Sequence, residues 1–179
     1  MNKSSNTKFA MFREQQKHFK FALENHDPNI WFPSLRGNFT EDNPANWFIC
    51  FVPSSWGRWQ GNYGVHFAFI YARERGSLPE RIRLPIGVET PMKKSFQQEF
   101  KESVISGVNM AGITQTNFVL QAKARTKLLE FDPIPFGGQS WKIAFERYIA
   151  LQPVVDLIAR VLKEYRNRGA FEVPMEFPT

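Results

Sequence analysis

The sequence predicts an α+β domain in which a mainly antiparallel, four-stranded sheet has its helices packed on one face. Segments with apolar residues at every second position alternate with segments that have them at every third or fourth position, in the order helix, strand, strand, strand, helix, strand, helix. The first three strand segments are joined by connections too short for parallel crossovers, which favours an antiparallel meander. The 179 residues, 42% of them hydrophobic, suffice for one core, so we expect a single domain over residues 1–179.

The first element is a helix over about residues 8–24. It ends before Asp27 and Pro28, because a residue that precedes proline is disfavoured in the helical conformation. A connection rich in Pro, Asn and Gly follows, over residues 28–46. The apolar stripe of the helix consists of Phe9, Phe12, Phe19 and Leu23.

Three strands come next, over residues 47–52, 65–73 and 81–88. The first is apolar on both faces and therefore reads as a central strand, whereas the other two alternate more clearly. Pro85 lacks a backbone donor, so we expect the third strand to lie at an edge of the sheet or to contain a bulge. Within it, Arg81 and Arg83 fall on the face opposite the aliphatic side chains.

The second half of the chain begins with a helix from Thr90 and Pro91, a strong start signal, to about Met110. After the fourth strand, a last helical section begins near Ser140, and Pro153 should kink it or split it into two helices. The tail, over about residues 170–179, contains two prolines and reads as extended.

The fourth strand, predicted over residues 117–127, carries the strongest functional signal. Period two places its apolar side chains on one face and a row of cations on the other, so this half-buried strand needs an anionic partner or open water. The apolar face is Phe118, Leu120, Ala122 and Ala124, and the polar face is Gln121, Lys123, Arg125 and Lys127.

The net charge of +6 favours nucleic acid, an acidic protein or an anionic membrane surface as a partner. Our main hypothesis is a non-enzymatic nucleic-acid-binding protein. A basic sheet face would neutralise phosphates if the third and fourth strands expose their cations on the same side. A solvated face without a ligand is the alternative. The cations concerned are Lys123, Arg125, Lys127, Arg81 and Arg83.

An aromatic loop over residues 54–64 contains three glycines and offers flat rings for base stacking. The same loop would alternatively fold its own rings onto the edge of the sheet. It also suits a subunit that docks an acidic protein, since Trp, Tyr and Arg dominate interface hot spots. The residues concerned are Trp56, Arg58, Trp59 and Tyr63.

A nuclease is the alternative function. The order of elements is similar to the core of the PD-(D/E)XK nuclease fold, which implies a metal site with acidic residues on the second and third core strands. Here neither strand has an acid at such a position, so a site would have to use Glu89, with Glu24 as a further acid. A degenerate relative that does not cleave would also fit this pattern.

Cysteine content and hydropathy indicate the compartment. Cys50 is the only cysteine, so the chain has no intramolecular disulfide and a reducing cytoplasm fits best. No apolar run approaches the roughly 18 residues of a membrane span, so we expect no membrane partner.

Cys50 and His66 are weak candidates for a thiolate pair, and a buried, inert thiol is the favoured interpretation. No metal-ligand pattern and no cofactor motif are present, so we predict neither.

Overall fold

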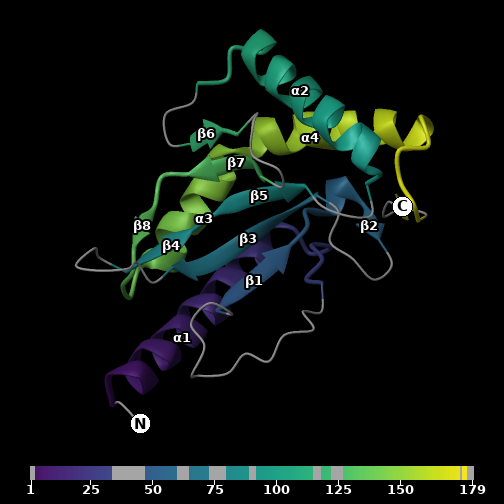
Figure 1. Cartoon of the computed structure of the whole chain (residues 1–179). Helices are drawn as coiled ribbons and strands as arrows, with labels where there is room; N and C mark the ends of the chain where they lie inside the picture. The colour runs from purple at the N-terminus through teal and green to yellow at the C-terminus, as the bar shows by residue number, and fades with distance from the viewer. Residues whose placement is uncertain are drawn as a thin grey trace.

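The computed structural model confirms the α+β class, with a mainly antiparallel sheet and helices packed on one of its faces (Figure 1). No helix in the described part of the chain is both long and apolar enough to cross a bilayer. The structure describes residues 3–33, 47–59, 65–72, 80–88, 92–114, 118–121, 127–173 and 175–176.

Four α-helices and one short 3₁₀ helix occur within these residues. The prediction that Pro153 divides the last helical section is confirmed, because α4 begins at Gln152 with the proline in its first turn. The helix expected from Thr90 begins instead at Lys94, since Met92 forms an isolated β-bridge with Phe171 of the tail. The helices are α1 (Lys3–His26), η2 (Ser54–Trp56), α2 (Lys94–Met110), α3 (Ser140–Ala150) and α4 (Gln152–Asn167).

The described strands form a seven-stranded sheet and a separate two-stranded one. In the larger sheet β3 is central, with β1 on one side and both β4 and β5 on the other; β7 pairs with β5, β8 with β4, and β6 with β7. The strands are β1 (Phe48–Phe51), β2 (Arg58–Trp59), β3 (Val65–Ala72), β4 (Arg81–Arg83), β5 (Pro85–Val88), β6 (Phe118–Leu120), β7 (Lys127–Phe131), β8 (Ile134–Pro135) and β9 (Met175–Glu176).

The segment predicted as the third strand is central, so the expectation of an edge strand is wrong. It appears as β4 and β5, which both pair with β3 in one continuous register, Tyr71 opposite Ile82 and Phe67 opposite Ile86. The alternative expectation of a bulge agrees with the structure, because the pairing of β5 with β7 shifts register between Ile86 and Gly87. An irregular ladder of this kind is a place where a strand tolerates proline.

The segment predicted as one cationic strand over residues 117–127 is instead two strands. β6 and β7 pair antiparallel, with Phe118 opposite Phe131 and Leu120 opposite Leu129, so the chain reverses direction between them. Period-two alternation does not encode such a reversal, because the pattern can continue through it. These divisions, together with the short strands β2, β8 and β9, explain why the strand count exceeds the predicted four.

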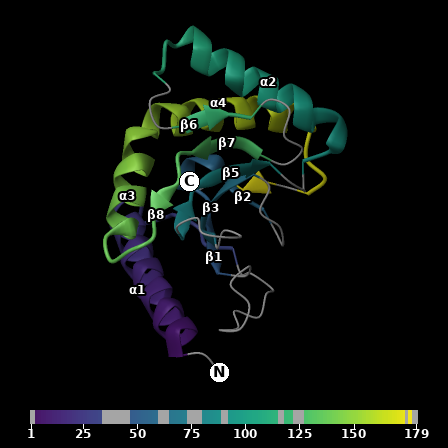
Figure 2. The same ribbon diagram turned by 60° about the vertical axis from the view of Figure 1, so that its left-hand side comes forward.

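Figure 2 shows α1, α3 and α4 along one side of the sheet. Aromatic side chains fill the core between the sheet and these helices. Phe67 and Phe69 of β3 point toward the helices, where Phe19 of α1 stacks on Phe69 at 4.7 Å and Tyr148 of α3 meets Phe67 edge-on at 5.4 Å. α2 lies outermost, packed on α4, with Gly107 against the side chain of Leu157. We call this side of the sheet the helix face.

Candidate nucleic-acid interface

Arg81 and Arg83 lie on the face of the sheet opposite the helices, as the alternation predicts. Their β3 partners are Ala72 and Ile70, whereas Ile82 between them is fully buried in the core. Both arginines are partly exposed. We call this side the cationic face, and α1, α3 and α4 all lie on the other side of the sheet (Figure 1).

Lys127 is joined to Arg83 on this face through a carboxylate that the sequence analysis did not identify. Glu130 of β7 lies opposite Pro85. Arg83 Nε donates to Glu130 Oε1 at 2.6 Å, and Lys127 Nζ donates to Glu130 Oε2 at 3.0 Å. Glu130 therefore holds two of the predicted phosphate-binding cations side by side.

Arg83 and Lys127 shift the pKa of the Glu130 carboxylate. Burial alone would raise the pKa of Glu130, but hydrogen bonds and charge attraction from Arg83 and Lys127 outweigh burial and hold that pKa below its usual range. The carboxylate is therefore ionised at neutral pH. Counting Arg81, Arg83 and Lys127 against Glu130, these four groups carry a net charge of +2.

Lys123 and Arg125 lie outside the described residues, as does Glu89. In the sequence, Lys123 and Arg125 stand between β6 and β7, within four residues of Lys127. Three of the five predicted backbone-contacting cations are thus placed: Arg81 and Arg83 lie on β4, and Lys127 lies on β7, which pairs with β5.

The prediction that Trp56 is an exposed stacking ring is wrong. Its side chain is fully buried, its indole stacks on Phe67 at 5.2 Å, and its Nε1 donates to the carbonyl of Val155 in α4 at 2.9 Å. The alternative interpretation, in which the loop folds its own rings onto the sheet, describes Trp56 correctly. The physical reason is that α4 offers both an apolar cover and a hydrogen-bond acceptor for the indole.

The rest of the predicted aromatic loop lies away from Arg81 and Arg83. Arg58 is exposed and donates to the carbonyl of Asn29 at 3.1 Å. The backbone of Trp59 belongs to β2, which pairs with β9 at the end of the sheet where β3 begins, whereas Arg81 pairs at the end where β3 stops. The Trp59 side chain and Tyr63 lie outside the described residues. The described part of the loop and the two arginines therefore lie at opposite ends of β3, whereas Lys127, opposite Gly87, lies toward the end where β3 begins.

The carboxylates do not assemble into a nuclease centre within the described ranges. Neither β3 nor β5 contains Asp or Glu. Glu24, near the end of α1, pairs with Lys20 at 3.5 Å, and Glu130 is engaged as described above. No group of three or more His, Cys, Asp or Glu that could hold a metal ion occurs among the described residues.

Cys50 and His66 lie on the cationic face on adjacent strands, and both are buried. Cys50 is opposite Ala68, two residues along β3 from His66, which agrees with a buried thiol. His66 is opposite Gly87, and its ring covers that glycine so closely that an added Cβ would lie 2.9 Å from His66 Cε1. Gly87 thus permits the close approach of the ring to the strand.

No family model, curated protein or solved structure matches this chain. The function must therefore be inferred from the chemistry of its own residues.

Proposed function

We propose that this protein binds nucleic acid without catalysing a reaction, and that it holds the phosphate backbone on the cationic face through Arg81, Arg83 and Lys127. The observation that carries this proposal is the position of the two arginines on alternate residues of β4, which pairs with β3 on one side and β8 on the other. At about 3.3 Å per residue, their Cα atoms are about 6.6 Å apart. That separation resembles the spacing of successive phosphates along an extended strand, so each guanidinium can engage its own phosphate.

Glu130 supports this role by positioning the cations before the ligand arrives. Its carboxylate presents oxygen atoms to Arg83 and Lys127 as a phosphate would, so both side chains are already directed toward an anion. A bound phosphate must compete with that carboxylate. We therefore expect moderate affinity that falls steeply with salt concentration.

Lys123 and Arg125 would extend the same surface, because they precede Lys127 closely in the sequence. The double substitution Lys123→Glu and Arg125→Glu should abolish binding at moderate salt and leave the melting temperature nearly unchanged. Fluorescence anisotropy and thermal unfolding of the same samples measure the two effects. Retained affinity would show that these two cations do not contact the ligand.

The decisive experiment is a titration of labelled single- and double-stranded DNA and RNA across a salt series. Each phosphate contact to a single strand contributes about 0.7 to the slope of log affinity against log salt. Arg81→Gln with Arg83→Gln should therefore reduce that slope by about 1.4. The matched control is Arg13→Gln with Arg160→Gln, which removes the same charge from exposed positions on α1 and α4. Equal losses in both pairs, or no binding by the native protein at low salt, would refute the proposal.

Glu130→Gln gives a second, opposite test. Removing the competing carboxylate should tighten binding several-fold, whereas Glu164→Gln, the same charge change at an exposed position of α4, should change it much less. Weaker binding by Glu130→Gln would contradict the competition between this carboxylate and the phosphate of the ligand. Titrations with and without Mg²⁺ also test the nuclease alternative, which requires metal-dependent loss of the labelled strand that disappears in Glu89→Ala.

A further inference from the structure

A second surface, unrelated to the cationic face, lies where α1 and α3 run side by side. Gln15 of α1, which is buried, fastens the two helices: its Nε2 donates to the carbonyl of Gly138 at 2.9 Å, and its Oε1 accepts from the backbone N–H of Trp141 at 3.1 Å. Further along, His18 stacks on Trp141 at 5.4 Å, and His26 meets Phe145 edge-on at 6.1 Å. The two helices are therefore neighbours from Gln15 to His26 of α1.

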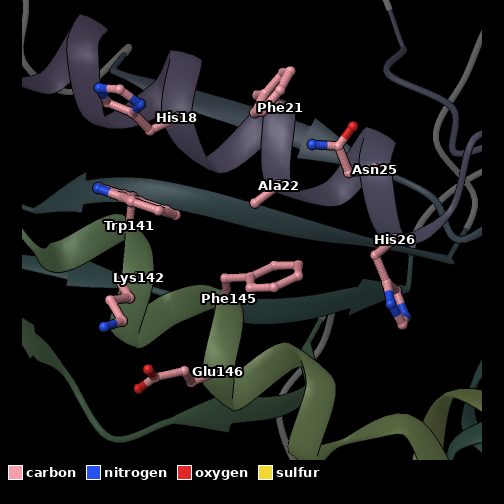
Figure 3. A pocket seen from close by; sticks show the side chains of 9 residues that line it. All are labelled: His18, Phe21, Ala22, Asn25, His26, Trp141, Lys142, Phe145 and Glu146. Carbon is pink, nitrogen blue, oxygen red and sulfur yellow. The ribbon is translucent and has the colours of Figure 1, made fainter.

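A groove of about 660 Å³ follows the line between them on the outer side (Figure 3). Ala22 and Phe145 face each other in its middle, the His18–Trp141 stack lies at one end, and His26 lies at the other. Phe21 stands on the α1 rim with its ring directed away from α3 and 65% exposed. A phenylalanine this exposed beside an apolar groove is typical of an interaction surface.

We propose that this groove is a self-association surface, in which α1 of a second copy lies antiparallel to α1 and places its Phe21 between α1 and α3. The same surface offers both the projecting ring and the groove that can receive it. Under a two-fold axis every contact occurs twice: the Phe21 ring of each copy enters the groove of the other. The four helices would form a bundle with Phe21 of each copy at its centre.

The charges of α1 favour an antiparallel second copy as the occupant. On the exposed side of the helix, Lys17 and Lys20 precede Phe21 and Glu24 follows it. In an antiparallel pair centred between Lys20 and Phe21, Lys17 faces Glu24 of the second copy, and Glu24 faces Lys17 of the second copy. A parallel pair would instead place like charges together. Glu14 is an acidic residue in the same part of α1 as Lys17 and Lys20. Its carboxylate lies 3.8 Å from His18 Nε2 of the same helix.

Sedimentation velocity of the full chain over a concentration series tests the proposal. The chain has a mass of 20.8 kDa, and we expect the measured mass to rise toward twice that value with concentration. Phe21→Arg should abolish the rise without changing the circular dichroism spectrum. Met110→Arg, at a position that is 86% exposed on α2, is the matched control and should still associate.

Charge reversal sharpens the test. Lys17→Glu and Glu24→Lys should each weaken association, and the two changes in one chain should restore it. The restoration cannot come from the ion pair between Lys20 and Glu24 within α1, at 3.5 Å, because the cation that Glu24→Lys introduces would still repel Lys20. A native protein that stays monomeric at every concentration, equal effects of Phe21→Arg and Met110→Arg, or no restoration in the double variant would overturn the proposal.

Discussion

The two faces of the central sheet are built from alternate residues of the same strands, yet around β4 they differ in burial and in charge. On the helix face, Ile82 and Phe67 are fully buried among aromatic rings. On the cationic face, Arg81 and Arg83 share the surface with Glu130 and remain partly exposed. The difference teaches that one strand can supply the stability of the fold and a binding surface at once. Substitutions on the helix face should therefore lower the free energy of unfolding more than substitutions on the cationic face do.

Trp56→Ala should produce the largest effect, because Trp56 belongs to the helix face. Removal of its ring leaves a cavity between β3 and α4 and removes the hydrogen bond to the Val155 carbonyl, so we expect a loss of about 3–5 kcal/mol in the free energy of unfolding. Urea denaturation measures it. Arg58→Ala, two residues away and exposed, should change the same quantity by no more than about 0.5 kcal/mol. Comparable effects at both positions would contradict the assignment of Trp56 to the core.

Trp56 also illustrates what the sequence could not reveal. Its local neighbours are glycine and serine, which suit an exposed loop, and the burial is imposed by Val155, 99 residues later in the chain. The pairing order of strands is a long-range property of the same kind. The pairing order places residues 81–88 inside the sheet, which local sequence does not encode. The reversal of the chain between β6 and β7 could not be predicted for the same reason.

Local periodicity, in contrast, predicted much of the fold and part of the site. The division of the last helical section at Pro153 and the faces of Ile82 and Arg83 agree with the structure, because they depend only on neighbouring residues. Glu130 was missed because it lies beyond the predicted end of the cationic strand at residue 127. Its spacing of three residues from Lys127 would place the two side chains on opposite faces of a regular strand, so local periodicity argued against the ion pair that the structure shows.

Gly87→Ala should have an intermediate effect, and it probes the cationic face. The new Cβ would lie 2.9 Å from His66 Cε1, so the buried ring must move, at a cost of about 1–3 kcal/mol in the free energy of unfolding. In a His66→Ala background the ring is gone and the same substitution should cost much less. Urea denaturation of the four proteins gives the coupling free energy. Additive effects would show that the ring does not limit position 87.

Glu130→Gln should have the smallest effect on unfolding, about 1 kcal/mol at neutral pH, and its size depends on pH. The folded state holds the pKa of Glu130 below its usual range, so the unfolded chain takes up a proton first as pH falls. The stability that Glu130 contributes is therefore fully present above its unfolded pKa of about 4.3, and it is lost as pH falls through the lower folded value. Native and Glu130→Gln proteins, unfolded in urea from pH 7 to pH 3, should converge at the acid end.

The same substitution separates the two roles of the cationic face. If Arg83 and Lys127 serve only the fold, Glu130→Gln lowers stability and leaves affinity for nucleic acid unchanged. If they hold phosphate, it lowers stability but tightens binding, because the carboxylate that stabilises the folded protein is also the ligand's competitor. Opposite signs in one variant cannot arise from a general loss of structure, since partial unfolding would weaken binding as well.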